Sequence, residues 1–289
     1  MDMDAELTAL RARFLAYAER HLHAGEPTET SRTDDDAIRL KIDHSFQVLA
    51  NAEYIMGSSG STPGTADGSG PSPETVRLCR IAALFHDTGR FPQYAAYKTF
   101  RDAESANHAS LGVRALLRER LLDSLSRRDR GVVLGAIALH NRRTIPNVLP
   151  APLGAVARLV RDADKIDIFQ LLLERLHEKG ASGGVVVMHA KDDPERYSPA
   201  ILESFRTRSL CDYRDVHWYH DVRMLLLSWV YDLNHAASVR LVAERGHFEL
   251  LLDALPETPP FPGLVAAVRE DIASILAGKD LAQRGAGSV

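Results

Sequence analysis

The stretch AALFHDTGRF, residues 82–91, decides the fold, because an apolar run ends there in an imidazole and a carboxylate. The run that leads to His86 and Asp87 is ETVRLCRIAALF, and its apolar spacing is that of a buried helix. We therefore expect a core helix over residues 73–86 that presents both polar side chains at its carboxyl end. A buried carboxylate in such a place needs a partner or a metal ion.

The rest of the chain is also predicted to be helical, because apolar residues recur at spacings of three and four. Ser72 and Pro73 supply a cap and a first-turn proline for the helix before His86, and Gly89 supplies a stop. Alternation of period two occurs only in GGVVVMHA, residues 183–190. The other helices that we expect lie over residues 5–22, 34–56 (capped by Thr33), 103–121, 128–140, 153–177 and 262–277, and a helical block is expected over 215–254.

We expect an all-α protein with one globular helical domain, residues 1–289. Its core spans residues 34–177, and residues 178–280 add an irregular segment and C-terminal helices. Residues 57–73, GSSGSTPGTADGSGPSP, are rich in Gly, Ser and Pro and predict a flexible surface loop. Because long surface insertions cost little free energy, we place this loop inside the domain and not at a boundary.

Composition narrows the classes of function. The chain has 289 residues, of which 45% are hydrophobic, and a net charge of -4 argues against a broad nucleic-acid-binding surface. No apolar run approaches the ~20 residues of a membrane span. The start, MDMDAELTAL, is acidic and unlike a signal peptide. The two cysteines argue against a disulfide scaffold and against a cysteine-based zinc site, which needs CxxC pairs. We expect a cytoplasmic protein without a membrane partner.

Six histidines and aspartates recur near the ends or on the apolar faces of the expected core helices. They are His44, His86, Asp87, His108, His140 and Asp164. Each alone has an ordinary explanation as a hydrogen-bonded core residue, a helix-end charge or part of a solvated face. Together, the mixed nitrogen and oxygen donors suit Fe, Mn, Zn, Ni or Co better than Ca. Six donors exceed one tetrahedral site, and a carboxylate that bridges two ions would use them all.

The order of these residues resembles the HD superfamily of metal-dependent phosphohydrolases, which is named after the adjacent His-Asp pair. The resemblance extends through LFHDTGRFPQY, YKTFRDAESANHASLGV, AIALHN, ARLVRDADKIDIF and LSWVYDLN, over residues 38–255, to one bacterial subgroup. It implies an HD-domain helical bundle with additional C-terminal helices. Two residues depart from the subgroup, in which glycine usually stands at Lys98 and aspartate at Asn107.

The resemblance implies one or two divalent transition-metal ions, with Mg as a further option. The implied ligands of a first metal are His44, His86, Asp87 and Asp164, and a second metal would be held by Asp87, His108 and His140. Asp164 is chosen over Asp162 and Asp167 because it stands in the subgroup's ADK string. Asp167, one helical turn away, would then support a ligand from behind.

The implied reaction is hydrolysis of a phosphate ester of a small molecule or nucleotide by metal-activated water. Asp87 and Arg90 are the expected catalytic residues, since Arg90 follows the pair by one turn and an arginine can orient phosphate. The expected substrate-binding residues are Arg90, Gln93, Tyr97, Lys98, Arg142 and Lys165, with Arg101 and Arg143 as weaker candidates. For each of them, a surface charge or ordinary packing is the alternative.

Two other classes of function share the same residues. Mixed-valent di-iron oxygenases of the HD type use a similar ligand order, and iron content and oxygen uptake would distinguish them. A non-catalytic nucleotide-binding sensor would keep the scaffold and bind nucleotide without turnover. The sequence carries no signal for the oligomeric state.

Overall fold

A computed structural model describes residues 2–23, 28–58, 71–179, 190–191, 193 and 195–279. These residues form helices and connecting segments without a strand, which confirms the all-α prediction. Among them, no helix is both long enough and apolar enough to cross a membrane. The chain divides into two compact units, Met1–Asp167 and Ile168–Val289. The expectation of a single domain stays a prediction.

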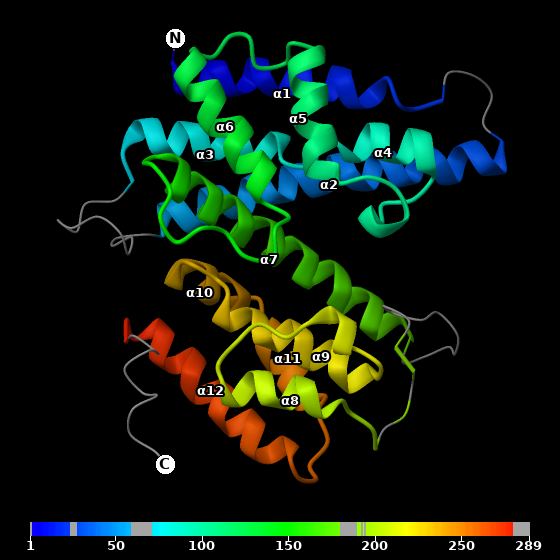
Figure 1. The fold of residues 1–289 in the computed structure, drawn as a ribbon, viewed down its shortest axis with the longest axis vertical. Helices are drawn as coiled ribbons and strands as arrows, with labels where there is room; N and C mark the ends of the chain where they lie inside the picture. Colours follow the sequence, from blue (N-terminus) through cyan, green and yellow to red (C-terminus); the bar gives the residue numbers. More distant parts are fainter. Residues whose placement is uncertain are drawn as a thin grey trace. The chain divides into compact units, whose positions relative to one another are not determined.

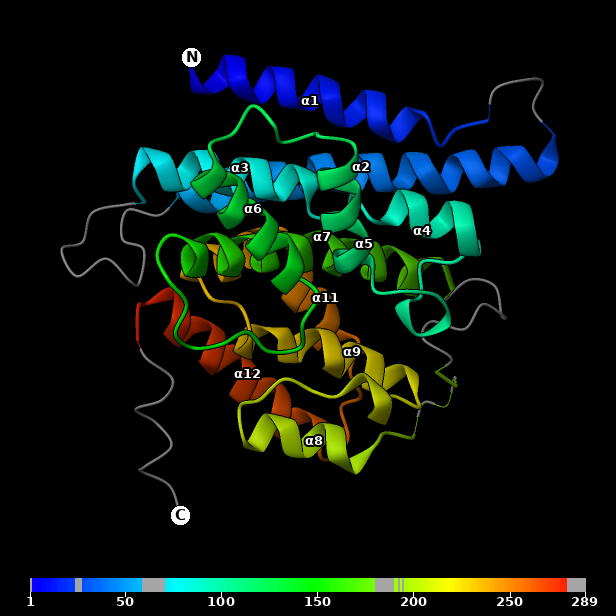
Figure 2. The ribbon, with the colours of Figure 1, turned by 45° about the horizontal axis from the view of Figure 1, so that its top comes forward.

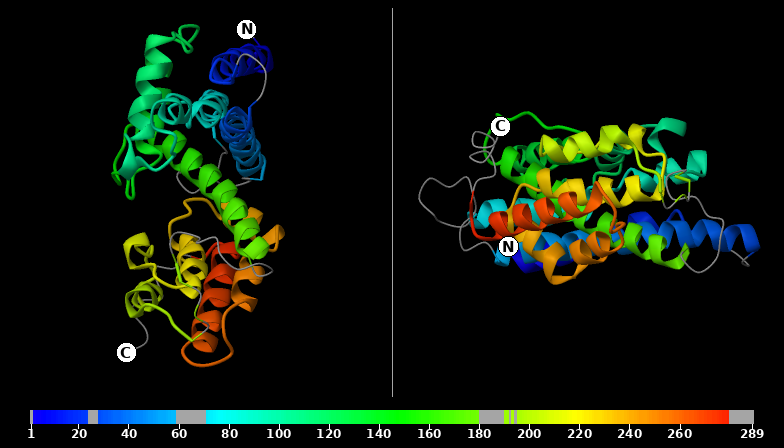
Figure 3. Two further views of the ribbon diagram at one scale, coloured as in Figure 1. Left: turned by 90° about the vertical axis from the view of Figure 1, so that its right-hand side faces the viewer. Right: turned by 90° about the horizontal axis from the view of Figure 1, so that it is seen from below.

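The first unit is a helical bundle built around α3, which packs against α1, α2 and α6 (Figures 1 and 2). Helix α5 packs against both α4 and α6. The helices of this unit are α1 (Met3–Glu19), α2 (Glu29–Gly57), α3 (Pro73–Phe85), α4 (Arg90–Tyr97), η1 (Asp102–Glu104), α5 (His108–Arg118), α6 (Arg127–Leu139) and the first part of α7 (Leu153–Lys179). Figure 3 (left) looks nearly along the axes of α1 and α3.

The core of this unit is the carboxyl-terminal half of α3, where every residue from Ile81 to Phe85 is buried. The ring of Phe85 meets Phe14 of α1 edge-on at 5.7 Å between centroids, and Phe14 also meets Phe46 of α2 at 5.8 Å. Buried aromatic pairs of this kind add about 1 kcal/mol each beyond the area that they bury. The apolar run before His86 is therefore the core of this unit, and it holds His86 and Asp87 at its carboxyl end.

Helix boundaries follow the capping residues. The predicted Ser72 cap and Pro73 start of α3 are confirmed, since Ser72 Oγ accepts the Thr75 N–H at 3.2 Å. The predicted start of α2 is wrong. Thr28 caps that helix by accepting the Ser31 N–H at 3.1 Å, so α2 begins five residues earlier than expected.

Other segments differ from the sequence-based expectations or lie outside the described residues. Helix α4 follows the His-Asp turn directly and was not predicted. The expected helix over 103–121 is a short 3-10 turn, η1, followed by α5. Most of the expected loop over 57–73, residues 59–70, lies outside the described residues, and so does most of the alternating segment 183–190.

The second unit is helical throughout its described residues. Its helices after α7 are α8 (Pro199–Arg206), η3 (Tyr213–Asp215), α9 (Tyr219–Leu227), η4 (Ser228–Tyr231), α10 (Ala236–Glu244), α11 (His247–Asp253) and α12 (Phe261–Leu276). Helix α12 packs on α10, and α9 packs on α8 and α11 (Figure 3). The buried Asp221 carboxylate accepts the Ser198 N–H at 2.7 Å and the Trp218 N–H at 3.0 Å, which fixes the start of α9.

Candidate metal centre

Five helices bring the six predicted ligands of the metal centre together. Helices α3 and α6 each end one residue before a histidine, so His86 and His140 lie at their carboxyl ends. His108 is the first residue of α5. The other three are His44 within α2, Asp87 in the turn after α3, and Asp164 within α7. Five of the six are buried and Asp164 is partly exposed.

A backbone contact places His108 beside the His-Asp turn. Gly89 has φ of −72°, so it does not occupy the left-handed conformation expected of a glycine that stops a helix. A Cβ atom at Gly89 would instead lie 2.0 Å from the carbonyl oxygen of His108 and 2.4 Å from the amide nitrogen of Gly112. Glycine is needed here because the turn after α3 touches the main chain of α5.

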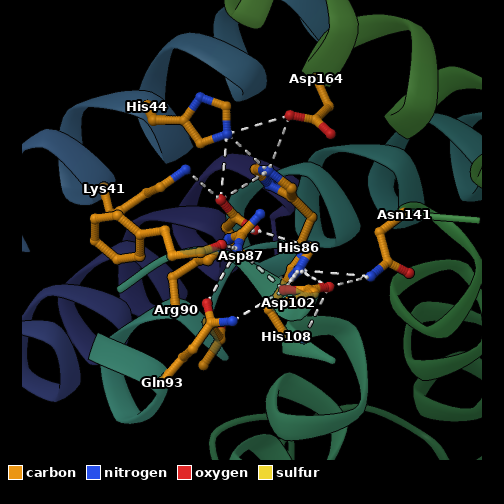
Figure 4. Close-up of polar contacts among 12 residues, drawn as sticks. Lys41, His44, His86, Asp87, Arg90, Gln93, Asp102, His108, Asn141 and Asp164 are labelled. Atoms are coloured by element: carbon orange, nitrogen blue, oxygen red, sulfur yellow. Dashed lines mark hydrogen bonds and ion pairs between the residues drawn. The ribbon is translucent and has the colours of Figure 1, made fainter. Parts of the chain in front are cut away.

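The four imidazoles form two pairs. The Nε2 atoms of His44 and His86 lie 3.1 Å apart, and those of His108 and His140 lie 3.0 Å apart. Asp87 stands between the pairs (Figure 4). Its Oδ2 lies 3.4 Å from His44 Nε2, and its Oδ1 lies 3.4 Å from His108 Nε2. Each oxygen of one carboxylate thus faces a different histidine pair.

Asp164 joins the first pair only. Its Oδ1 lies 3.2 Å from His44 Nε2 and 3.6 Å from His86 Nε2. Ligand atoms within 4.8 Å of one another occur in two groups in the described residues: His44, His86 and Asp164, and His86, Asp87 and His140. His86 belongs to both groups, and its ring meets that of His140 at 5.2 Å. The two groups therefore adjoin.

Every imidazole of the centre has an acceptor on its other nitrogen. The Nδ1 atoms of His86 and His140 donate to the carbonyl oxygens of Ala83 and Ile137, at 2.8 and 2.7 Å. His44 Nδ1 donates to Asp167 at 2.6 Å, and His108 Nδ1 donates to Asp102 at 2.8 Å. Oxygen partners of this kind fix the tautomer that leaves Nε2 free to bind a metal.

This donor set fits a divalent metal ion. Two neutral imidazoles protonated on Nδ1 turn lone pairs toward each other at 3.0–3.1 Å, which is repulsive unless a cation lies between or beside them. Nitrogen and carboxylate donors in this mixture suit a transition metal. The residues present can therefore hold the metal that the sequence predicts.

Buried charges in the centre stabilise one another. Burial alone would raise the pKa of Asp87, but Lys41, Arg90 and the neighbouring histidines together hold that pKa well below its usual range. Burial also acts to raise the pKa of Asp164, but the hydrogen bonds and charges of His44 and His86 together lower it. Burial and Lys41 act to lower the pKa of His44, yet the aspartates around it raise that pKa to about 10. Without a metal, a proton on His44 therefore relieves the first pair.

The second pair is backed by a network centred on Asp102. This carboxylate accepts bonds from His108, from Gln93 Nε2 at 2.9 Å and from Asn141 Nδ2 at 3.2 Å. Arg90 reaches it through Nη1 at 3.3 Å and also donates from Nε to Asp87 Oδ1 at 3.3 Å. The predicted residues Arg90 and Gln93 thus lie at the centre, where they bond protein carboxylates.

Lys41 also lies at the centre. It stands one turn before His44 on α2, and its Nζ donates to Asp87 Oδ2 at 2.9 Å. Lys41 was not predicted from the sequence, although its three-residue spacing from His44 was a usable signal, since such residues share a helix face. Asp102 was also missed. It lies in a 3-10 turn, where no periodicity connects it to His108.

The remaining predicted substrate-binding residues lie in other surroundings. Lys98 Nζ pairs with Asp34 at 2.6 Å, and Tyr97 is half-exposed. Arg142 is exposed. Burial and Arg161 lower the pKa of Lys165, which adjoins Asp164 in sequence, to about 7. The weaker candidates Arg101 and Arg143 are exposed as well.

The structure shows the backbone setting of the two departures from the subgroup pattern. Lys98 ends α4 with φ of 55°, the left-handed conformation that favours glycine. Asn107 caps α5, because its Oδ1 accepts the Ser110 N–H at 2.9 Å. The imidazole of His108 is oriented by Asp102, so a neutral residue at 107 leaves its support in place.

Comparison with known proteins adds one finding. The family model of the HD domain matches residues 42–168, a range that includes all six predicted ligands. Neither the curated proteins nor the solved structures contain a match to the chain.

Proposed function

We propose, from the premise that residues 42–168 form an HD domain, that this protein is a phosphohydrolase with two divalent metal ions in one centre. Proteins with this domain are generally metal-dependent phosphohydrolases. The single observation that carries the proposal is the position of Asp87, whose Oδ2 and Oδ1 each lie 3.4 Å from a histidine of a different pair. A carboxylate with two oxygens in separate donor sets is suited to bridge two ions.

The proposed ligands divide between the two ions along these contacts. His44, His86, Asp164 and Asp87 Oδ2 would hold the first ion, and His108, His140 and Asp87 Oδ1 would hold the second. A divalent ion supplies a water with a lowered pKa and neutralises charge on phosphate oxygens. Asp167 and Asp102 would hold His44 and His108 in the ligating orientation through Nδ1.

The charge of the centre favours an anionic substrate once both ions are bound. Four carboxylates lie beside the imidazoles: Asp87, Asp102, Asp164 and Asp167. Two cations, Lys41 and Arg90, contact Asp87. With neutral imidazoles this leaves two net negative charges, which two divalent ions convert into two net positive charges. A phosphate monoester carries about −1.5 to −2 at pH 7 and would match them.

The proposed reaction adds water across the phosphate ester. A new P–O bond forms from the water oxygen, the ester P–O bond breaks, and the alcohol leaves with a proton. Arg90 would hold Asp87 in place through its Nε, at 3.3 Å from Oδ1, and would add positive charge beside the phosphoryl group. A small phosphate ester or a nucleotide is the proposed substrate class.

The test is hydrolysis under argon by protein reconstituted with Mn²⁺. Phosphomonoesters, phosphodiesters and nucleotides would be screened for release of phosphate or nucleoside, with His86→Ala as the control that removes a ligand shared by both groups. Activity without oxygen that is lost in His86→Ala is expected. Turnover that requires both iron and oxygen would point to the oxygenase alternative. Tight nucleotide binding without turnover, retained in His86→Ala, would point to the sensor.

A further inference from the structure

We propose that Lys41 binds the phosphoryl group of the substrate, through ammonium hydrogens that its contact with Asp87 leaves free. This inference rests on the proposed phosphohydrolase function and names a residue that recognises the substrate's charge. It goes beyond the ligand set, because Lys41 can hold no metal and was not among the residues predicted from the sequence.

Lys41 is held at the edge of the ligand cluster. Its side chain is 14% exposed, and Nζ donates to Asp87 Oδ2 at 2.9 Å, on the side of the His44–His86 pair. The ammonium also lies over the ring of Phe100, 5.4 Å from its centroid. That ring packs against Tyr94 at 4.8 Å. The cation is therefore positioned by a carboxylate and an aromatic face.

The ammonium has unused hydrogen-bonding capacity. A lysine carries three donors, and in the described part of the chain Asp87 is the one hydrogen-bond acceptor of Lys41. Arg90 differs, because both its Nε and its Nη1 already bond protein oxygens, on Asp87, Gln93, Phe100 and Asp102. Among the described residues, the Nη2 hydrogens of Arg90 also have no protein acceptor, but several bonds fix that guanidinium, whereas one hydrogen bond holds the Lys41 ammonium. Lys41 is therefore the less constrained of the two cations that contact Asp87.

Metal binding would add positive charge beside the Lys41 ammonium and so favour an anion there. An ion held by Asp87 Oδ2 would share that oxygen with the Lys41 ammonium, and two cations on one carboxylate oxygen repel each other. A phosphoryl oxygen that accepts from Lys41 and faces the ion would offset the repulsion. The same contact would distinguish phosphorylated from uncharged substrates.

The experiment measures binding of inorganic phosphate, the expected product, to Mn²⁺-loaded protein by isothermal titration calorimetry. Lys41→Met removes the charge and keeps a long side chain, and Lys41→Arg keeps the charge. Arg39→Met is the matched control, since it removes a cation that is 57% exposed on the same helix. Manganese content of each variant is measured by elemental analysis.

We expect Lys41→Met to keep its manganese and to bind phosphate about 10- to 100-fold more weakly, the worth of one hydrogen bond to a charged group. Lys41→Arg should recover part of the affinity, and Arg39→Met should match the unmodified protein. Equal phosphate affinity in Lys41→Met would overturn the inference. Loss of manganese in that variant would do so too, since Lys41 would then act by supporting Asp87. An unmodified protein that binds Mn²⁺ but neither binds phosphate nor hydrolyses any ester would overturn the proposed function itself.

Discussion

The two histidine pairs have similar internal geometry but different electrostatic surroundings. The first pair faces two carboxylates, Asp87 and Asp164, and its backing residue Asp167 is buried. The second pair faces Asp87 alone among the described carboxylates, and its backing residue Asp102 is 31% exposed. Because anionic ligands raise the affinity for a divalent ion, we expect the first position to bind metal more tightly than the second.

The same difference is visible without a metal. A proton relieves the first pair, since the surrounding aspartates raise the pKa of His44 to about 10. The second pair has no such relief, because burial lowers the pKa of His108. A first ion must therefore displace the proton of His44. A second ion would enter between the Nε2 lone pairs of His108 and His140, which already repel each other.

Asp87→Asn should have the largest effect, since it removes the charge of the carboxylate that faces both histidine pairs. We expect metal affinity to fall by at least about 100-fold at both positions, because a neutral amide is a poorer ligand and is set among buried cations. Elemental analysis after dialysis against limiting Mn²⁺ would report it, with Asp164→Asn as the comparison. If Asp87→Asn kept two ions per chain and Asp164→Asn lost both, the shared role of Asp87 would be excluded.

Gly89→Ala should separate the two pairs. The new Cβ would lie 2.0 Å from the His108 carbonyl oxygen, so α5 and the turn after α3 must move apart. We expect a loss of about 3 kcal/mol in the free energy of unfolding and weaker binding of the second ion than of the first. Denaturant unfolding and metal titration would measure both quantities.

Gly131→Ala is the matched control for this prediction. A Cβ there would meet nothing within 4 Å, and the residue is exposed within α6. We expect a gain of up to about 1 kcal/mol from helix propensity. A Gly89→Ala variant as stable as Gly131→Ala would show that the close approach of the two main chains does not constrain the fold.

Asp167→Asn and Asp102→Asn should act on different ions. Each removes the carboxylate behind one histidine, His44 or His108, and such changes typically lower metal affinity about 10- to 100-fold. We expect Asp167→Asn to weaken the first ion and Asp102→Asn the second. Competition with a metal-binding dye would resolve the two steps. Identical loss of both ions in the two variants would argue that the pairs act as one site.

The smallest expected effect is the loss of stability that the metal-free protein undergoes when Asp102 is protonated in acid. Burial acts to raise the pKa of Asp102, but the bond and charge of His108 together with Gln93 and Arg90 lower it to about 2. Because the folded-state pKa is depressed, this stabilisation is present above about pH 4 and is lost as the pH falls toward 2. We expect it to contribute roughly 1 kcal/mol after solvent screening. Urea unfolding between pH 2 and 5 should show a smaller loss of stability in Asp102→Asn than in the unmodified protein.

Sequence periodicity predicted the parts of this fold that depend on regular burial. The all-α class and the Ser72–Pro73 start of α3 follow from local spacing and capping chemistry. The start of α2 was predicted at the wrong residue. Thr33, followed by acidic residues, is as suitable a capping sequence as Thr28, which is the actual cap. Composition near a helix start does not say which residue bonds the exposed amides.

The candidate metal ligands could be predicted from the sequence, whereas most of the residues that hold them in position could not. The resemblance named six residues, and the structure brings them together around Asp87 (Figure 4). Asp102 and Lys41 could not be chosen in the same way, since each acts through a contact between segments distant in sequence. The role of Gly89 was misjudged for the same reason, because only the position of α5 shows what its missing side chain allows.

The contact between Gly89 and α5 also offers a way to sort sequences. Main-chain atoms make this contact, so it can be recognised in a sequence by two glycines. One is Gly89, after the His-Asp pair, and the other is Gly112, four residues after His108. A chain with the same pair but bulkier residues at these positions must hold its third histidine farther away. We expect such chains to bind one ion, and glycine at both positions to mark centres built for two.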